Sequence, residues 1–431
     1  MLYSDYSKNF ITRFCYEFFH PSCKMNKNVP PSLFACIKKF LRRFFSYCRH
    51  PDFKKPPISK IIFFSTTINN NNALQPIWSK LNEKDYSLWL RDYIFAETKI
   101  VFYSFLYLTL FFKMYISLSK DDRAIVREYN YWFMNIYGYY KTIGHFLKKN
   151  KNKIKLIVMA NDHSTTNQCI LDNCIKYGIK TMFVQHSAVA MFSPPNRFTY
   201  SILDNIDSYK KYCDIGAVNT RAFVCGGTRF DVLYQQNYIR KYIGIAINDL
   251  DKMEKVIELC VFLIKNNVKD IILRPHPGMI LGKNIEDEFE KMGVLISNSK
   301  TENCFVYLSK LKLLISNDSS IHEDALLARI PSVVYNFSDL KYMDTYGFVK
   351  SGITNYCHGF DDVLNECFTP HVVDKNLVVK KNPSCNTKYE GKVSEFIAAF
   401  INSITNRNED EFINANFRLD EKGCFEYKLN D

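Results

Sequence analysis

A repeated alternation of short apolar runs with stretches of helical period constrains the fold of this chain more than any other feature. In the second half, the apolar runs begin at Tyr242, Asp270, Val294, Lys312 and Ile330, with helical patterns between them. Short β-rich runs that alternate with helices are typical of parallel sheets flanked by helices. The second half is therefore predicted to be an α/β domain.

The first half shows the same alternation around a long helical region. Its strand candidates are 60–68, 154–166, 179–189 and 222–227. Its helical patterns are 73–81, the aromatic region 83–150, and 167–177, which Gly178 ends. Because the alternation occurs twice, with a seam near 235–241, we predict two doubly wound, Rossmann-like domains. Such sheets bind ligands at the carboxyl ends of their strands, so a shared cleft is expected there.

These patterns divide the chain of 431 residues into four segments. Residues 1–57 form an N-terminal basic amphipathic segment, and 58–238 form the first Rossmann-like domain with its aromatic helical insertion. Residues 239–360 form the second Rossmann-like domain, and 361–431 are predicted to be a C-terminal helical segment.

The N-terminal segment contains a helix predicted at 33–45, between two proline-containing stretches. At 100° per residue, one arc carries its apolar side chains: Leu33, Phe34, Ile37, Phe40, Leu41, Phe44 and Phe45. The opposite arc carries Lys38, Lys39, Arg42 and Arg43. Such a helix suits an anionic membrane surface, with its aromatic face in the lipid interface. The pattern leaves a second interpretation open, in which the apolar face packs on the protein's own core.

The longest apolar stretch runs from Ile100 to Phe112, and Lys113 ends it. Thirteen residues make a helix of roughly 20 Å, shorter than the about 30 Å of hydrocarbon in a bilayer. We therefore expect a buried aromatic helix under the first domain rather than a membrane span.

Charge and cysteine usage restrict the class of partner and the compartment. The 57 Lys and Arg against 44 Asp and Glu give a net charge of +13, which suits phosphate-rich ligands, anionic lipid or nucleic acid. The fourteen cysteines are scattered without a CxxC pair or zinc spacing, so we expect reduced thiols in a cytoplasmic protein. The first residues lack the basic head and apolar run of a signal peptide.

Polar loops follow two strand candidates of the first half. The sequence NDHS at 161–164 follows the run LIVMA, and Asp162 there is placed to act as a general base. An Asp that caps the following helix is the alternative. His163, Gln185 and His186 are candidate contacts with a ligand in the same crevice, although a lone His is often a structural, hydrogen-bonded residue.

In the second half, the sequence RPHPG at 274–278 follows a strand candidate directly. A proline on each side, with φ fixed near −65°, holds His276 rigidly at the strand end. His276 is therefore a candidate donor to a phosphate oxygen, and Arg274 a candidate for a charge-assisted contact. A purely structural turn is the alternative.

A second polar loop, SNDSS at 316–320, also lies between a strand and a helix. Its hydroxyls and the backbone N–H groups at the helix start would suit a phosphate, so Asn317, Ser319, Ser320 and Glu323 are candidate binding residues. The alternative is a capping box, in which Ser320 is the N-cap and Glu323 the N3 residue.

Several catalytic motifs are missing from the sequence. It contains no GxxxxGK[ST], no GxGxxG after the first strand, no HExxH, no GxSxG and no kinase signature. No acidic DxD triplet lies at a strand end, so no bound metal is expected.

These motifs together resemble a known family. The stretch 307–337 is similar to the donor half of two-domain GT-B glycosyltransferases, and RPHPG with the later serine pair resembles the HP and SS motifs of bacterial sialyltransferases and related CMP-sugar enzymes. GIKTMFVQHSAV resembles the QHG segment of capsule and surface-polysaccharide transferases, and FVCGGTRFDVL the segment that closes their first domain. The resemblance covers roughly residues 154–338.

The resemblance implies roles for individual residues. His276 would contact the donor phosphate, Ser319 and Ser320 would hold it, and Asp162 would match the catalytic base of an acidic-acidic-Gly motif. The sequence departs from that motif at Asn161 and His163. It also has Ser187 where the QHG segment has its glycine, which weakens the Asp162 assignment relative to the His276 one.

The resemblance implies an inverting, metal-independent glycosyltransferase of GT-B fold, with no cofactor. It would move an acidic, sialic-acid-like or Kdo-like sugar from a CMP donor to a glycan acceptor, in the synthesis of surface polysaccharide or lipopolysaccharide. The expected location is peripheral, on the inner face of the cell membrane, without a nucleic-acid partner. A CDP-alditol phosphotransferase of the teichoic-acid type and a noncatalytic membrane-associated assembly protein are the alternatives.

Overall fold

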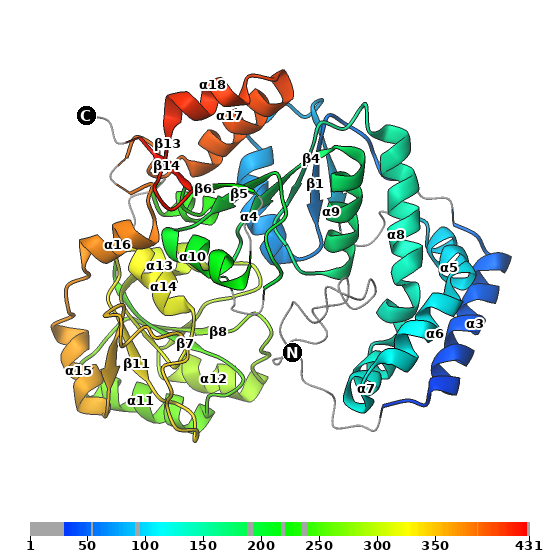
Figure 1. The fold of residues 1–431 in the computed structure, drawn as a ribbon. Helices are drawn as coiled ribbons and strands as arrows, with labels where there is room; N and C mark the ends of the chain where they lie inside the picture. Colours follow the sequence, from blue (N-terminus) through cyan, green and yellow to red (C-terminus); the bar gives the residue numbers. More distant parts are fainter. Residues whose placement is uncertain are drawn as a thin grey trace. The chain divides into compact units, whose positions relative to one another are not determined.

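The chain forms two compact units (Figure 1). The computed structural model describes residues 30–52, 55–90, 95–187, 189, 193–216, 220–234, 239–385 and 387–428. Unit 1 comprises Met1–Arg229 together with Val393–Asp431, and unit 2 comprises Phe230–Lys392. The seam predicted near 235–241 lies close to the first of these boundaries. The second boundary was not predicted. Residues 361–431 were expected to form a separate helical segment, but Val393–Asp431 belongs to unit 1.

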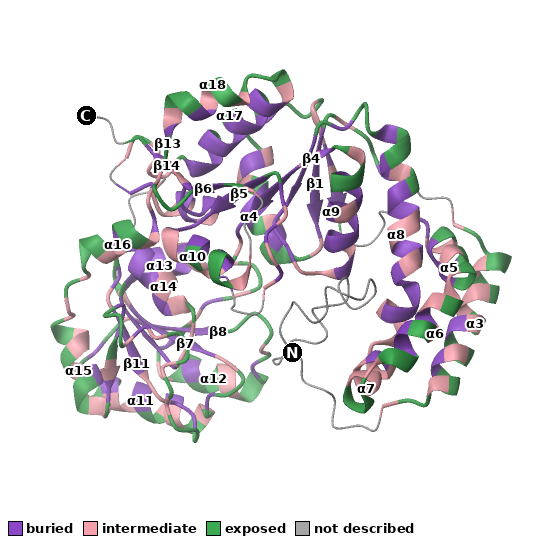
Figure 2. Cartoon of the chain, in the orientation of Figure 1, coloured by how far each residue is buried: buried purple, intermediate pink, exposed green. Residues whose placement is uncertain are grey.

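Unit 1 is built on an eight-stranded sheet. Its strands are β1 (Ile61–Ser65), β2 (Tyr86–Leu90), β3 (Leu156–Met159), β4 (Lys180–Val184), β5 (Tyr200–Leu203), β6 (Arg221–Val224), β13 (Phe417–Leu419) and β14 (Phe425–Tyr427). Their order is β13-β14-β6-β5-β4-β3-β1-β2, and every neighbouring pair is parallel except β13 with β14. The central strands are buried along their whole length, as expected for a sheet covered on both faces (Figure 2).

The helices of unit 1 fall into two groups. Those that accompany the sheet are α4 (Ile68–Trp78), α9 (Thr165–Tyr177), α10 (Ile206–Ile215), α17 (Val393–Asn406) and α18 (Glu409–Asn416). A separate helical layer contains α3 (Leu33–Arg49), α5 (Glu97–Leu106), α6 (Leu108–Ser117), α7 (Lys120–Glu128) and α8 (Asn130–Asn150). The long helix α8 joins the groups, because it packs against α9 on one side and α5 on the other.

The basic amphipathic helix forms as predicted, but its apolar face packs on the protein. Ser32 caps α3 by accepting from the backbone N–H of Ala35 at 3.2 Å. Cys36 and Phe40 are buried in the core of unit 1. Leu33, Ile37, Leu41 and Phe44 pack against the same core, whereas Phe34 and Phe45 are exposed. The structure therefore shows the second of the two interpretations that the sequence left open.

The sequence suggested one helix over the apolar stretch 100–112, but the structure has two. It breaks at Tyr107 into α5 and α6, which bend by 64° from each other. No single helix in the described ranges is long and apolar enough to cross a membrane, although this bent pair passes the same test together.

A Cβ on Gly138 of α8 would overlap the carbonyl oxygen of Ile100, so the glycine allows α5 and α8 to approach closely.

Unit 2 is a six-stranded, fully parallel sheet. Its strands are β7 (Tyr242–Ile247), β8 (Ile271–Pro275), β9 (Leu295–Ile296), β10 (Leu311–Ser316), β11 (Ser332–Tyr335) and β12 (Asn355–Cys357), in the order β12-β11-β10-β7-β8-β9. Its helices are α11 (Met253–Lys265), α12 (Lys283–Lys291), α13 (Cys304–Ser309), α14 (Ile321–Leu327), α15 (Phe360–Phe368) and α16 (Lys375–Lys381).

The predicted fold class is confirmed: apart from the antiparallel pair β13 and β14, each unit is a parallel sheet with helices between most successive strands. The order in unit 2 corresponds to 3-2-1-4-5-6 in Rossmann-type sheets, counted from β7. The first five strands of unit 1 have the order 2-1-3-4-5 of flavodoxin-like sheets. The sequence analysis missed β2, β5, β12, β13 and β14, which have at most five residues each.

Candidate functional site

Each sheet has one topological switch point, where the strand order reverses. In unit 1 it lies between β1 and β3, and in unit 2 between β7 and β10. Ligands of such sheets bind outside the carboxyl ends of the strands at this point. The loop with Asp162 follows β3, and the loop with Ser319 follows β10. The residues that the sequence singled out therefore lie at the expected place in each unit.

Asp162 is buried at the edge of the unit 1 sheet and is fully engaged. Its side chain is only 8% exposed. The Tyr212 hydroxyl donates to Oδ2 at 2.5 Å, and Nδ1 of His163 lies 2.9 Å from Oδ1. Burial by itself would raise the pKa of Asp162, but the hydrogen bonds from His163 and Tyr212 hold that pKa below its ordinary value. The group is therefore a carboxylate at neutral pH.

His163 is the accessible member of this pair, with 42% of its side chain exposed. The loop around it is fixed by Asn161, whose Oδ1 accepts from the backbone N–H groups of His163 at 3.0 Å and Ser164 at 2.8 Å. A carboxylate against Nδ1 selects the tautomer in which Nε2 is a proton acceptor, and the Asn161 amide lies 3.5 Å from that nitrogen. The sequence predicted the base to be Asp162. In the structure Asp162 is buried, and its carboxylate contacts the more exposed His163.

Gln185 and His186 follow β4, the strand next to β3. Gln185 is buried and holds the loop together: its amide donates to Ser187 at 2.9 Å and Ser208 at 3.0 Å, and its oxygen accepts from Asp204 at 3.0 Å. The predicted ligand contact from Gln185 is therefore not supported, because its polar atoms have internal partners.

His186 lies near enough to Asp162 and His163 for their charges to affect its pKa. Burial lowers the pKa of His186, and the nearby Asp162 carboxylate partly offsets this effect. Its Nδ1 is buried and has no hydrogen-bond partner among the residues that the structure describes. The backbone of Ala160 also interacts with the ring, and the Ser187 hydroxyl lies 3.4 Å from Nε2, so the predicted ligand contact from His186 stays a prediction.

An ion pair that the sequence analysis missed lies at the ends of the next two strands. Asp204 directly follows β5, and Arg229 follows β6. The Arg229 guanidinium is 2.7 Å from Oδ2 of Asp204, and both side chains are largely buried. The signal was present, because Asp204 ends the short run YSIL much as Asp162 follows LIVMA. Tyr212, on α10, gave no comparable signal.

In unit 2, His276 lies at the carboxyl end of β8 and is exposed. Its backbone N–H donates to the carbonyl of Ile247 at the end of β7, at 2.8 Å. The backbone N–H of Gly278 donates to Nδ1 of His276 at 3.1 Å, which leaves Nε2 as the nitrogen that can donate to a ligand. The predicted rigid presentation of the imidazole is present.

Arg274 does not accompany His276. Its side chain is buried, and its guanidinium donates to Ser297 Oγ at 2.7 Å and to the Glu302 carbonyl at 2.9 Å. It also lies 5.0 Å from the ring centroid of Tyr307. The predicted donor contact from Arg274 is therefore not supported, because successive strand residues point to opposite faces and this side chain is held inside unit 2.

A hydrogen bond joins the loops after β7 and β10. The Asn317 amide donates to Oδ1 of Asp251 at 2.7 Å, and Asp251 Oδ2 accepts from the N–H of Asn248 at 2.8 Å. Asn317 is buried and its Oδ1 accepts from the Asp318 N–H at 2.8 Å, so it positions the loop rather than offering a free amide. Burial raises the pKa of Asp251, although the Asn317 hydrogen bond opposes the shift.

The capping box proposed for this loop does not form. Ser320 is in helical conformation at the start of α14 and makes no side-chain capping hydrogen bond. Glu323 instead pairs with Lys381 of α16 at 3.0 Å, so the predicted ligand contact from Glu323 is not supported either. Ser320 is exposed and Ser319 partly exposed. Their hydroxyls are thus available at the switch point, apart from a weak 3.4 Å contact from the Ile321 N–H to Ser319 Oγ.

One group within the described ranges brings potential metal ligands close together. Asp420, Cys424 and Glu426 lie in the hairpin of β13 and β14, with ligand atoms within 4.8 Å of one another. Lys422 is 3.7 Å from Asp420 and Arg418 is 3.6 Å from Glu426. The twelve cysteines of the described part are all free thiols.

Several solved structures have a similar backbone fold at low sequence identity. A UDP-GlcNAc 2-epimerase from Neisseria meningitidis bound to UDP-GlcNAc has a TM-score of 0.48 and 11% identity, covering 81% of this chain and 100% of the other. One from Rickettsia bellii has 0.45 and 14%, covering 82% and 98%. The wall teichoic acid polymerase TagF has 0.46 and 12%, covering 92% and 98%. No protein-family model matches the chain, and no curated protein matches it.

Proposed function

We propose that this protein is a glycosyltransferase that uses a nucleotide-linked sugar donor. The observation that carries the proposal is the placement of an Asp–His pair at the switch point of one sheet and of two serine hydroxyls at that of the other, with an exposed His after the neighbouring strand β8. The first set can take up a proton, and the second can bind a phosphate group. Glycosyl transfer from a nucleotide sugar needs both.

In the proposed reaction, Nε2 of His163 accepts the proton of the attacking acceptor hydroxyl. Asp162, held by Tyr212, stabilises the imidazolium that forms. The acceptor oxygen bonds to the anomeric carbon as the bond to the donor phosphate breaks, with inversion. His276, Ser319 and Ser320 donate hydrogen bonds to the phosphate oxygens as negative charge develops there. The residues named supply a base and phosphate contacts, so the proposal includes no metal or cofactor.

We infer an acidic sugar on a CMP donor as the substrate class, and a surface-polysaccharide or lipopolysaccharide glycan as the acceptor. The HP and SS motifs of the sequence support this choice through His276 and the pair Ser319 and Ser320. The proposed location is the inner face of the cell membrane. Lys38, Lys39 and Arg42 on the exposed side of α3 support it, because they present positive charge to anionic lipid.

The test is turnover of CMP-, CDP- and UDP-linked donors by the purified protein, with and without a chelator. We expect release of CMP from a CMP-sugar, unaffected by the chelator, and a product of inverted anomeric configuration by NMR. Turnover of a CDP-alditol instead would identify a phosphotransferase. Absence of turnover with every donor would identify a noncatalytic protein.

The division of roles between Asp162 and His163 has its own test. His163→Gln should lower turnover by about 10²–10⁴-fold, the usual contribution of a positioned base. Asp162→Asn should also lower it and shift the pH profile, because the imidazole loses its charged partner. If Asp162→Asn abolishes turnover while His163→Gln retains more than half, Asp162 itself is the base.

A further inference from the structure

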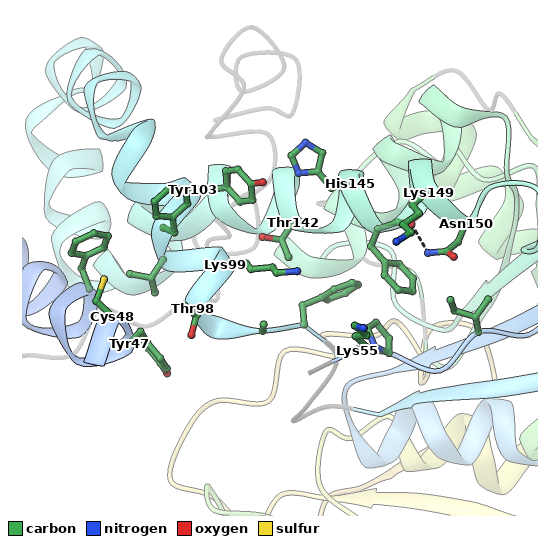
Figure 3. Close-up of a pocket in the computed structure, with 18 residues that line it drawn as sticks. Tyr47, Cys48, Lys55, Thr98, Lys99, Tyr103, Thr142, His145, Lys149 and Asn150 are labelled. Atoms are coloured by element: carbon green, nitrogen blue, oxygen red, sulfur yellow. Dashed lines mark hydrogen bonds between the residues drawn. The ribbon is translucent and has the colours of Figure 1, made fainter. Parts of the chain in front are cut away.

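Unit 1 contains a cavity of about 470 Å³ (Figure 3). No residue of the proposed reaction is among the residues that line it. Its walls come from the end of α3, the segment 55–58, the start of α5 and the end of α8. The volume lies within the range of about 300–1,000 Å³ that is typical of small-molecule sites.

The walls of the cavity are mainly aromatic and aliphatic. The apolar lining residues include Phe44, Pro56, Phe95, Val101, Phe102 and Phe146. Phe102 is 48% exposed and Ile58 38%, so the apolar lining continues to the molecular surface. Phe44 also stacks on the partly exposed Phe105 at 4.5 Å. A hydrocarbon chain fits such a wall, because it removes apolar surface from water on both partners.

The charge on the lining has one sign. Lys55, Lys99 and Lys149 line the cavity, and no Asp or Glu is among the described residues that line it. None of these three lysines has a carboxylate within 4.0 Å in the part of the chain that the structure describes. An occupant with an anionic group near the lysines would therefore be favoured.

Two carboxylates at the start of α5, Asp52 and Glu97, already have partners. Asp52 accepts hydrogen bonds from the backbone of Glu97 at 3.2 Å and of Thr98 at 3.1 Å. Glu97 accepts from the Tyr131 hydroxyl at 3.1 Å and lies 3.6 Å from Arg43. These contacts direct both carboxylates to the protein, so neither neutralises the lysines of the cavity.

A buried polar atom provides independent evidence for a ligand. Thr142 of α8 lines the cavity and is 6% exposed, and its hydroxyl has no hydrogen-bond partner among the described residues. Figure 3 shows Thr142 and Lys99 in the middle of the cavity, with Lys55 and Lys149 toward one end. A buried hydroxyl without a partner is unfavourable, so a ligand acceptor atom that reaches it after rotation of the Thr142 side chain would remove that cost.

We propose that this cavity binds one molecule of an anionic membrane phospholipid. One acyl chain lies along the aromatic wall, an ester oxygen accepts from Thr142, and the phosphate lies among the three lysines. The site deepens the membrane association proposed above. It requires no donor or turnover, so its failure would leave the proposed transfer reaction untouched.

Trp89 offers a direct reporter for an acyl chain in the cavity. Its ring lies 5.6 Å from that of Phe95 and 5.5 Å from that of Phe146, and both phenylalanines line the cavity. The experiment mixes the full chain with vesicles of phosphatidylglycerol or phosphatidylcholine whose acyl chains carry bromine, which quenches nearby tryptophan fluorescence. We expect saturable quenching with phosphatidylglycerol, which Trp89→Phe removes, and much weaker quenching with phosphatidylcholine.

Two variants test the two halves of the site. Replacing Lys55, Lys99 and Lys149 together by Gln should weaken binding by on the order of five-fold per lysine, since each contributes about 1 kcal/mol near an anionic surface. The matched control is Lys148→Gln, Lys151→Gln and Lys153→Gln, three exposed lysines of the same region that do not line the cavity. The control should lose much less affinity.

The second variant, Thr142→Phe, places a ring inside the cavity and should abolish the quenching. A thermal melt checks that it folds, and the lysine variants provide the test if it does not. The proposal is overturned if phosphatidylglycerol fails to quench Trp89, if phosphatidylcholine quenches equally, or if the two triple-lysine variants behave alike. Persistent quenching in a folded Thr142→Phe protein would also overturn it.

Discussion

Removing the Tyr212 hydroxyl should destabilise unit 1 by more than an ordinary hydrogen bond is worth. Tyr212 is buried, and it donates to the Asp162 carboxylate at 2.5 Å. A hydrogen bond to a charged group is worth about 1.5–3 kcal/mol, against about 0.5–1.5 kcal/mol for a neutral pair. We therefore expect Tyr212→Phe to lower the free energy of unfolding by about 1.5–3 kcal/mol at pH 7.

The same helix supplies a matched control. Tyr209, also on α10, donates to the backbone carbonyl of Lys422 at 2.8 Å, which is a neutral acceptor. Tyr209→Phe should cost about 0.5–1.5 kcal/mol. Urea unfolding followed by tryptophan fluorescence is the assay, because all three tryptophans of the chain lie in unit 1: Trp78, Trp89 and Trp132. A loss for Tyr212→Phe no larger than that for Tyr209→Phe would refute the charged hydrogen bond.

The pH dependence gives the reasoning a second test. The pKa of Asp162 is lowered in the folded protein, so its contribution to stability is present above the unfolded pKa of about 3.9. The contribution is lost as the pH falls through the folded pKa. The excess cost of Tyr212→Phe should thus be constant from pH 7 to about pH 5 and decrease only in strong acid. A decrease between pH 7 and pH 6 would contradict this assignment.

Three further substitutions test other parts of the structure. His276→Ala should lower turnover by about 100-fold or more at unchanged unfolding free energy, since the exposed imidazole acts on the leaving phosphate; a mutant with over half of wild-type turnover would make RPHPG only a turn. Replacing Ser319 and Ser320 by Ala should weaken CMP binding in calorimetry without loss of stability, because Ser320 makes no capping bond; unchanged affinity would remove both from the site. Gly138→Ala should lower the melting temperature, although Ala favours helices by about 1 kcal/mol, because its Cβ meets the Ile100 carbonyl; an equal or higher melting temperature would mean that α5 and α8 can separate at little cost.

The sequence located most strands of both sheets because buried parallel strands have a strong signal. Runs such as LIVM at β3 and IIFFS at β1 are apolar on both faces, which few other structures require. The missed strands β5 (YSIL) and β12 (NYC) contain polar residues, so no continuous apolar run marks them. Length alone is not the reason, because β3 is as short as β5 and was predicted.

The candidate site was located more easily than its roles were assigned. Asp162 and His276 each come just after a strand, and this alone predicted that they lie at the carboxyl edge of a sheet. It gave no information on exposure: Asp162 is buried under His163, and Arg274 turns into unit 2 toward Ser297. Likewise, the spacing of Ser320 and Glu323 matched a capping box, but the Lys381 ammonium on a distant helix takes the glutamate. Tertiary partners of this kind have no local sequence signature.

The return of the chain to unit 1 has a consequence for its synthesis. Strand β14 pairs with β6, and Phe223 of β6 lies against Phe400, Phe417 and Phe425 of the returning segment. A ribosome produces all of unit 2 before it produces these residues. Unit 2 can complete its sheet on the nascent chain, while the first-made unit waits with an open strand edge and an uncovered aromatic ring. The order of folding is therefore expected to be the reverse of the order in which the two units begin to be translated.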